Sequence, residues 1–99
     1  MEAQFELAMR GIYDAALNLN PPYRATIFLR MVNNHGGREA ANRLLAAQNP
    51  AEGFTQLFLR NALELSVEYL ILQDQWHTLF TDNQREIARV RLRSMDFNI

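Results

Sequence analysis

Residues that begin or end helices interrupt this chain at short intervals and limit it to short helices. They stand at Asn20-Pro21, Asn33-Asn34-His35-Gly36-Gly37, Asn49-Pro50, Ser66 and Thr81. Between these points apolar residues recur at the three- and four-residue spacing of one helical face, and no segment alternates for long enough to predict a strand. The sequence therefore predicts an all-α fold, a compact single-domain bundle of five to seven short helices that takes in residues 1–99.

The same residues set the expected boundaries of the helices. We expect helices at about residues 2–18, 21–34, 38–48, 50–61, 67–73 and 82–95. Asn20 and Asn49 each precede a proline, which is typical of an N-cap, and Thr81 with Gln84 is typical of a capping box. The expected core consists of Phe5, Ile12, Phe28, Val32, Leu44, Leu45, Phe54, Phe58, Leu70, Trp76, Phe80 and Ile87.

The composition excludes several kinds of chemistry. The chain has no Cys, which rules out disulfides, thiolate catalysis and Cys-based zinc sites. Its formal net charge of −1 gives nucleic acid no overall attraction. No apolar run approaches the roughly 18 residues of a membrane span, and the first residues do not follow the pattern of a secretion signal. We therefore expect a soluble cytoplasmic protein that uses no cofactor and does not bind membranes.

All ten basic residues are Arg. A surface built for bidentate contacts to carboxylate or phosphate shows this bias, but a GC-rich coding sequence produces it too, and we favour the second interpretation. Arg85, Arg89 and Arg93 share one face of the last expected helix, a row of the kind that tracks phosphates. Asp82 and Glu86 lie one turn away and are spaced to pair with them, so we favour a solvated face without a binding role. Arg91 projects toward the core instead, so we expect it either to snorkel toward solvent or to pair with a carboxylate.

Few residues are arranged for catalysis or metal binding. His35 and His77 each lack the further ligands that a zinc site needs, so we expect no metal. Gly36-Gly37 matches no phosphate-binding motif and is interpreted as a turn between helices. Arg30 and His35 have the spacing of the R-x4-H motif of HEPN ribonucleases, whose chemistry needs both side chains at one site. The second and third helices have the lengths of a helix-turn-helix, but nothing in them is specific for DNA.

A binding surface remains as the most plausible functional feature. Exposed polar groups in loops next to scattered apolar residues suit protein recognition. The residues that we expect to bind a partner run from the polar face of the first helix to the turn after the second: Asp14, Asn18, Asn33, Asn34, His35 and Glu39.

A series of short motifs runs through residues 23–97. It comprises Gly36-Gly37, Ala40-Ala41, Arg43-Leu44-Leu45, Gly53-Phe54-Thr55, Leu57, Leu63-Glu64-Leu65-Ser66-Val67-Glu68, Leu70, Trp76, Leu79-Phe80-Thr81, Ile87-Ala88-Arg89 and Arg91-Leu92. This order resembles an uncharacterised helical module that ends many bacterial and phage proteins, some of them near nucleases and defence genes. The chain departs from the module at Asn61-Ala62-Leu63, where the usual sequence is Gly-Arg-Leu.

A free-standing copy of the module looks like a small inhibitor from a phage or mobile element, most similar to anti-CRISPR proteins that block type I-F Cascade. The resemblance implies a monomer in the bacterial host cytoplasm that binds Cas subunits, without direct contact to nucleic acid, and blocks target DNA binding without catalysis. It assigns no role to individual residues. The alternatives are a HEPN-like ribonuclease that uses Arg30 and His35, or a helical accessory domain of a defence nuclease.

Overall fold

Short helices make up nearly all of the chain. The computed structural model describes residues 1–98, and within them it has six α-helices and two 3-10 helices. They are α1 (Glu2–Leu17), α2 (Thr26–His35), α3 (Gly37–Ala46), α4 (Glu52–Leu59), η1 (Leu63–Leu65), α5 (Val67–Ile71), η2 (Asp74–Leu79) and α6 (Asp82–Ser94). The predicted all-α bundle of short helices is confirmed.

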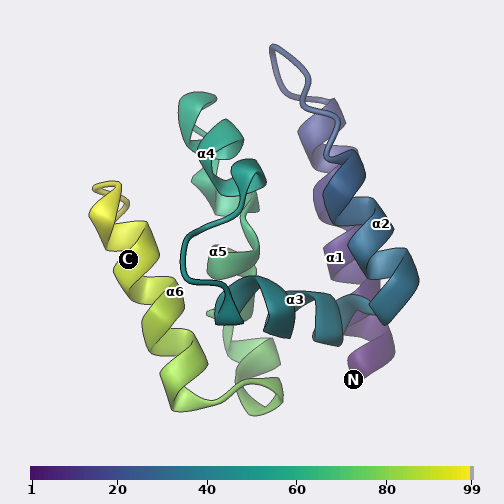
Figure 1. Ribbon diagram of the computed structural model, residues 1–99, viewed down its shortest axis with the longest axis vertical. Coiled ribbons are helices and arrows are strands. Elements are labelled where there is room, and N and C mark those ends of the chain that lie inside the picture. Colours follow the sequence, from purple (N-terminus) through teal and green to yellow (C-terminus); the bar gives the residue numbers. More distant parts are fainter. Residues whose placement is uncertain (99) are drawn as a thin grey trace.

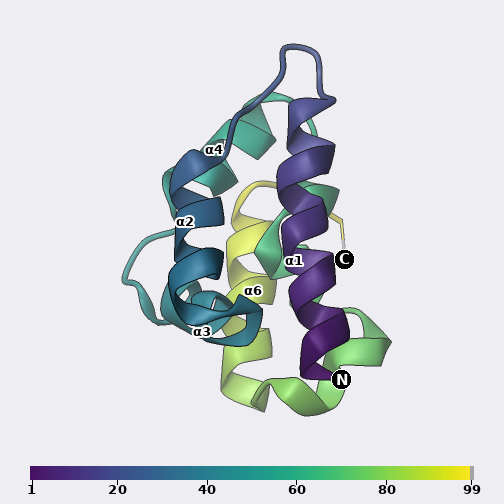
Figure 2. The ribbon, with the colours of Figure 1, turned by 90° about the vertical axis from the view of Figure 1, so that its right-hand side faces the viewer.

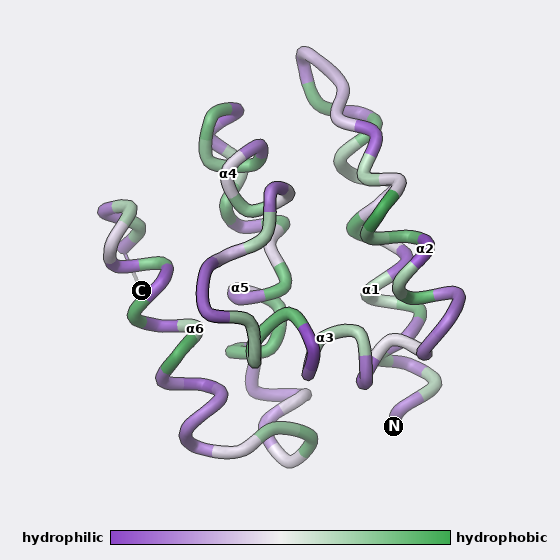
Figure 3. Tube along the Cα trace, viewed as in Figure 1, coloured by the Kyte–Doolittle hydropathy of each residue, from purple (hydrophilic) through white to green (hydrophobic). Residues whose placement is uncertain are grey.

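The helices divide into two groups that α3 joins. α1 and α2 lie side by side in opposite directions and form one side of the molecule (Figures 1 and 2). α3 leaves the end of α2, crosses the molecule and contacts α1, α2 and α6. α5 packs against α6, which forms the opposite edge, and α4 stands next to them. Figure 3 shows that the trace of α6 is largely hydrophilic, as suits a helix with one face in the core.

The core consists of two clusters of buried side chains. The larger joins α1, α2 and α3 to η2 and α6, and at its centre Phe5 packs against Trp76 and Phe80. The smaller gathers residues of α4, η1 and α6 around Phe54. Most of the predicted core residues are buried or partly buried, but Phe58 is 41% exposed, so its prediction is wrong. Adjacent residues of a helix point about 100° apart. α4 therefore buries Leu57 against the core and leaves the next residue, Phe58, exposed.

Two of the predicted helix starts are also wrong. α2 begins at Thr26 rather than at residue 21, because Pro21 itself precedes a proline and such a residue avoids the helical region. α4 begins at Glu52 with Ala51 at the N-cap, so Asn49 does not cap it. The capping box of α6 is confirmed: the Thr81 hydroxyl accepts a hydrogen bond from the backbone N–H of Gln84 at 3.1 Å.

Two glycines allow α3 to start against α1. Gly36 has a φ of 84°, which L side chains rarely adopt, and a Cβ on Gly37 would lie 2.7 Å from the Cα of Glu6. We expect Gly37→Ala to lower the free energy of unfolding by about 1–3 kcal/mol, because the two backbones must separate. A methyl group on Gly11 would have no atom within 4 Å. Gly11→Ala is therefore the control and should raise stability by about 0.5–1 kcal/mol. Urea titrations measure the free energy of unfolding of both variants, and equal losses would contradict the close approach.

Candidate functional site

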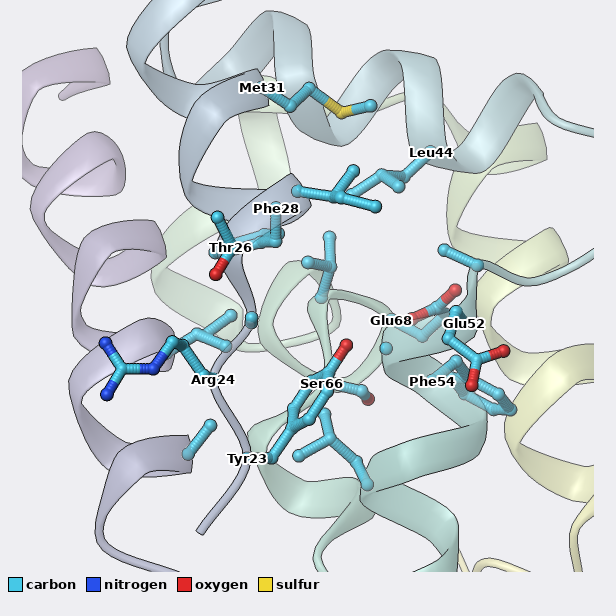
Figure 4. A pocket seen from close by; sticks show the side chains of 18 residues that line it. Tyr23, Arg24, Thr26, Phe28, Met31, Leu44, Glu52, Phe54, Ser66 and Glu68 are labelled. Atoms are coloured by element: carbon cyan, nitrogen blue, oxygen red, sulfur yellow. The ribbon is translucent and has the colours of Figure 1, made fainter.

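A cavity lies between the α1–α2 pair and the α4–α5 group (Figure 4). Its volume is about 350 Å³, within the range of small-molecule sites. Most of its lining is apolar and comes from all five of the first α-helices, including Ile12, Ala16, Ile27, Phe28, Met31, Leu44, Phe54, Leu57 and Val67. Ile27, which is 74% exposed, stands at the edge of the cavity. We refer to this cavity as the apolar pocket.

The apolar pocket exists because the segment between α1 and α2 stays extended. Residues 21–25 run from α1 across to α2 without forming a helix, and the N–H of Tyr23 donates to the carbonyl of Ala16 at 2.9 Å. This bond holds Tyr23 beside α1, where its side chain reaches the first turn of α4. The pocket thus separates the two core clusters over part of their boundary, with residues of both in its walls.

Oxygen atoms gather on one side of the apolar pocket. Figure 4 shows the Tyr23 hydroxyl, the carboxylates of Glu52 and Glu68 and the Ser66 side chain there, with Met31 on the opposite side. The Ser66 hydroxyl donates to the Leu63 carbonyl at 2.7 Å and accepts from the backbone of α5, so its proton is already used. Ionised carboxylates also accept only, and this side of the pocket therefore offers acceptors and few donors.

Arg60 and Glu52 lie close to Tyr23 and act on the pKa of its hydroxyl. The Arg60 guanidinium stands 5.3 Å from the ring centroid and donates to the carbonyls of Pro21 and Pro22 at 2.7 and 3.2 Å. Burial raises the pKa of the Tyr23 hydroxyl, the charge of Glu52 raises it further, and Arg60 opposes both. The hydroxyl stays protonated at neutral pH and lies close to a negative charge.

A buried ion pair reaches the wall of the apolar pocket through Glu68. Arg91 donates to the Glu68 carboxylate at 3.0 Å, and the two residues are 8% and 4% exposed. Arg91 also donates to the carbonyls of Leu44 and Ala47 at 3.1 and 2.7 Å, which satisfies the end of α3. The sequence left snorkelling or pairing open for Arg91, and the structure shows pairing, with the side chain buried. The partner could have been suspected, since Glu68 is an acid within an otherwise apolar run.

Four of the predicted partner-binding residues gather where α2 meets α3. Asn33, Asn34, His35 and Glu39 are exposed there, and His35 and Glu39 line a groove of about 410 Å³ against the start of α1. We call these four residues the polar corner. Asp14 and Asn18 are exposed as well, but they lie farther along α1: Asn33 contacts Arg10, and Asp14 and Asn18 follow one and two turns later.

Hydrogen bonds between helices fix the polar corner. Arg10 donates to the Asn33 amide oxygen at 2.7 Å, and the N–H of Gly37 donates to the Glu6 carboxylate at 3.0 Å. The Gly37 N–H, and next the Arg10 guanidinium, lower the pKa of Glu6, so this acid remains charged at neutral pH. Arg38 adds bonds to the Glu2 carboxylate and to a carbonyl of η2, each at 3.0 Å.

The Arg30 and His35 spacing and the arginine row of the last helix lie outside the apolar pocket. Arg30 and His35 both lie on the continuous helix α2, roughly 140° apart around its axis, and His35 alone lines the groove at the polar corner. Arg85 is buried rather than part of a solvated row: it donates to the carbonyls of His77 and Phe80 and to the Asp82 carboxylate. Arg89 pairs with Glu86 at 3.3 Å on the exposed face of α6.

Among residues 1–98, no three His, Cys, Asp or Glu side chains converge as metal ligands. No helix in that range is long and apolar enough to span a membrane. Comparisons of the chain with protein-family models, with curated proteins and with solved structures find no match. The candidate sites therefore stand on their geometry: an apolar pocket with acceptors on one side, and a rigid polar corner.

Proposed function

We propose that this protein is a non-enzymatic inhibitor that binds a CRISPR surveillance complex of the type I-F Cascade class. In this proposal the protein occupies a Cas subunit surface that target DNA needs, and the polar corner makes the contact. The class of target rests on the resemblance of the motifs in residues 23–97 to a helical module of phage and bacterial proteins. The geometry of the polar corner supports a binding role.

The observation that carries the proposal is the rigidity of the polar corner. Side chains of α1 and α3 cross-link the helices that carry it: Arg10 holds the Asn33 amide, and Glu6 and Arg38 join the start of α3 to α1, so its backbone keeps its position without a partner. A surface ordered in advance loses less conformational entropy on association than a flexible loop. A domain of this size can therefore bind tightly through a small area.

The charges of the groove suit a partner that binds nucleic acid. Its lining has three carboxylates, from Glu2, Glu6 and Glu39, against one guanidinium from Arg38. Glu39 pairs with Arg43 at 3.1 Å in an exposed i,i+4 contact. Such pairs contribute at most about 1 kcal/mol, so an arginine of the partner can replace Arg43. Carboxylates placed in an Arg- and Lys-rich channel then compete with DNA phosphate for the same donors.

The test is a competition experiment. Purified type I-F Cascade is mixed with increasing amounts of the protein and then with a labelled target duplex, and DNA binding is measured. We expect binding to fall to background and the titration to end at a fixed molar ratio, because the inhibitor acts by occupancy. Unchanged DNA binding at saturating protein overturns the proposal.

Charge reversal tests the assigned surface. Glu39→Arg reverses the acid of an exposed intrahelical pair at the polar corner, and Glu86→Arg reverses the acid of a similar pair on α6, at the opposite edge. We expect Glu39→Arg to weaken inhibition by at least tenfold, about 1.4 kcal/mol, and Glu86→Arg to inhibit as the unmodified protein does. Equal inhibition by both variants contradicts the role of the polar corner, even if the protein is an inhibitor.

A further inference from the structure

The apolar pocket is distant from the polar corner and has a separate chemistry. It lies beside the extended segment before α2, whereas the polar corner lies at the opposite end of that helix. Its volume of about 350 Å³ accommodates a small organic molecule, and its walls are mainly aliphatic and aromatic. Binding there does not depend on the proposed function.

We propose that the apolar pocket binds a small molecule with an apolar body and a cationic amine head. The apolar body packs between Phe28, Met31 and Leu44, and the ammonium group lies on the side of Tyr23 and Glu52. The arrangement of the pocket's oxygen atoms carries this inference, because those of Tyr23, Glu52, Ser66 and Glu68 lie on one side, away from Met31, while the Thr26 hydroxyl stands apart from them (Figure 4).

The first step is the count of donors and acceptors. Ser66 has committed its proton to a carbonyl, Glu68 accepts from Arg91, and the Glu52 carboxylate accepts from the Gln56 amide at 2.8 Å. On this side the Tyr23 hydroxyl is the side-chain group with a proton left to offer. A ligand therefore has to supply donors, and an ammonium group supplies three.

The second step is the charge. Glu68 shares its charge with Arg91, but the bond partner of Glu52 is a neutral amide, and Glu52 is exposed at the pocket's edge. Arg24 also lines the pocket, yet its guanidinium points away from the centre in Figure 4. A second cation, the Arg60 guanidinium, lies over the Tyr23 ring and donates to backbone carbonyls and to Gln56. At the Tyr23 hydroxyl the charge of Glu52 acts more strongly than that of Arg60, so a head group placed there is favoured as a cation and disfavoured as a carboxylate.

Three ligands of similar shape test whether the pocket prefers a cationic head group or binds any apolar molecule. Phenylbutylamine, phenylbutanol and phenylpentanoate share a phenyl ring on four methylenes and differ in the charge of the head group. Dissociation constants from amide chemical-shift titrations at pH 7 are expected to rank the amine first, about tenfold tighter than the carboxylate, a difference of about 1.4 kcal/mol. Shifts should concentrate on residues that line the apolar pocket. No binding of any ligand, or a carboxylate that binds as tightly as the amine, overturns the proposal.

Variants identify the head-group site and the pocket. Glu52→Gln keeps the shape of an exposed side chain and removes its charge, and we expect it to abolish the preference for the amine over the alcohol. Glu64→Gln is the matched control, since Glu64 is an exposed acid outside the pocket. Leu44→Trp should fill the pocket and remove binding of all three ligands in a protein that still unfolds cooperatively. Equal effects of Glu52→Gln and Glu64→Gln, or undiminished binding in folded Leu44→Trp, overturn the assignment.

Discussion

Replacement of Arg91 by methionine is expected to lower the free energy of unfolding by about 3–5 kcal/mol at neutral pH. The variant leaves the Glu68 carboxylate buried without its cation and removes the donor to the carbonyls of Leu44 and Ala47. Urea unfolding followed by the fluorescence of Trp76, the single tryptophan of the chain, measures the loss.

The matched control lies two residues farther along the same helix. Arg93→Met removes an exposed guanidinium from α6 and should change stability by no more than about 0.5 kcal/mol. A double variant, Glu68→Leu with Arg91→Met, removes both charges and should recover part of the loss, because no buried carboxylate remains unpaired. Equal losses from Arg91→Met and Arg93→Met contradict the importance of the buried pair.

The pH dependence of the Arg91→Met loss identifies Glu68 as its source. Burial raises the pKa of Glu68 above its ordinary value, while its own backbone N–H and Arg91 lower it. A folded-state pKa above the unfolded one favours folding at low pH, and this contribution is lost as the pH rises through the folded value. Without Arg91 the pKa rises further. The loss should therefore be smaller near pH 4, where the missing bonds to the Leu44 and Ala47 carbonyls remain, and grow toward pH 7; a loss that is independent of pH contradicts this origin.

Local sequence patterns predicted the elements that depend on near neighbours. Thr81 and Gln84 form their capping box within one turn, and Ser66 accepts the N–H of Tyr69 as an N-cap does. Arg91 was placed inward because its position on the helical face follows from periodicity alone. These predictions succeed because the interacting groups are separated by few residues.

Contacts between distant segments could not be predicted in the same way. The apolar pocket needs Tyr23, Glu52 and Glu68 from three parts of the chain, and no local pattern specifies how α2 and α4 stand relative to one another. The extended segment before α2 contains two successive prolines, and the first of them is kept out of the helical region by the second. A single proline is compatible with a helix start, so the local pattern favoured a helix there. Asn33, His35 and Glu39 lie together because they are close in sequence, whereas Asp14 and Asn18 lie farther along α1.

Phe5→Ala should cost about 3–5 kcal/mol, and Phe58→Ala less than about 1 kcal/mol, although periodicity predicts a core position for both. Phe5 is 0% exposed and its ring centroid lies 5.3 Å from Trp76 and 5.2 Å from Phe80. Phe58 is 41% exposed, so truncation leaves a smaller cavity and less lost contact. The free energy of unfolding from urea titration, followed by helical circular dichroism, distinguishes the two variants, since Phe5→Ala also changes the environment of Trp76. Equal losses contradict the burial difference and return Phe58 to the core.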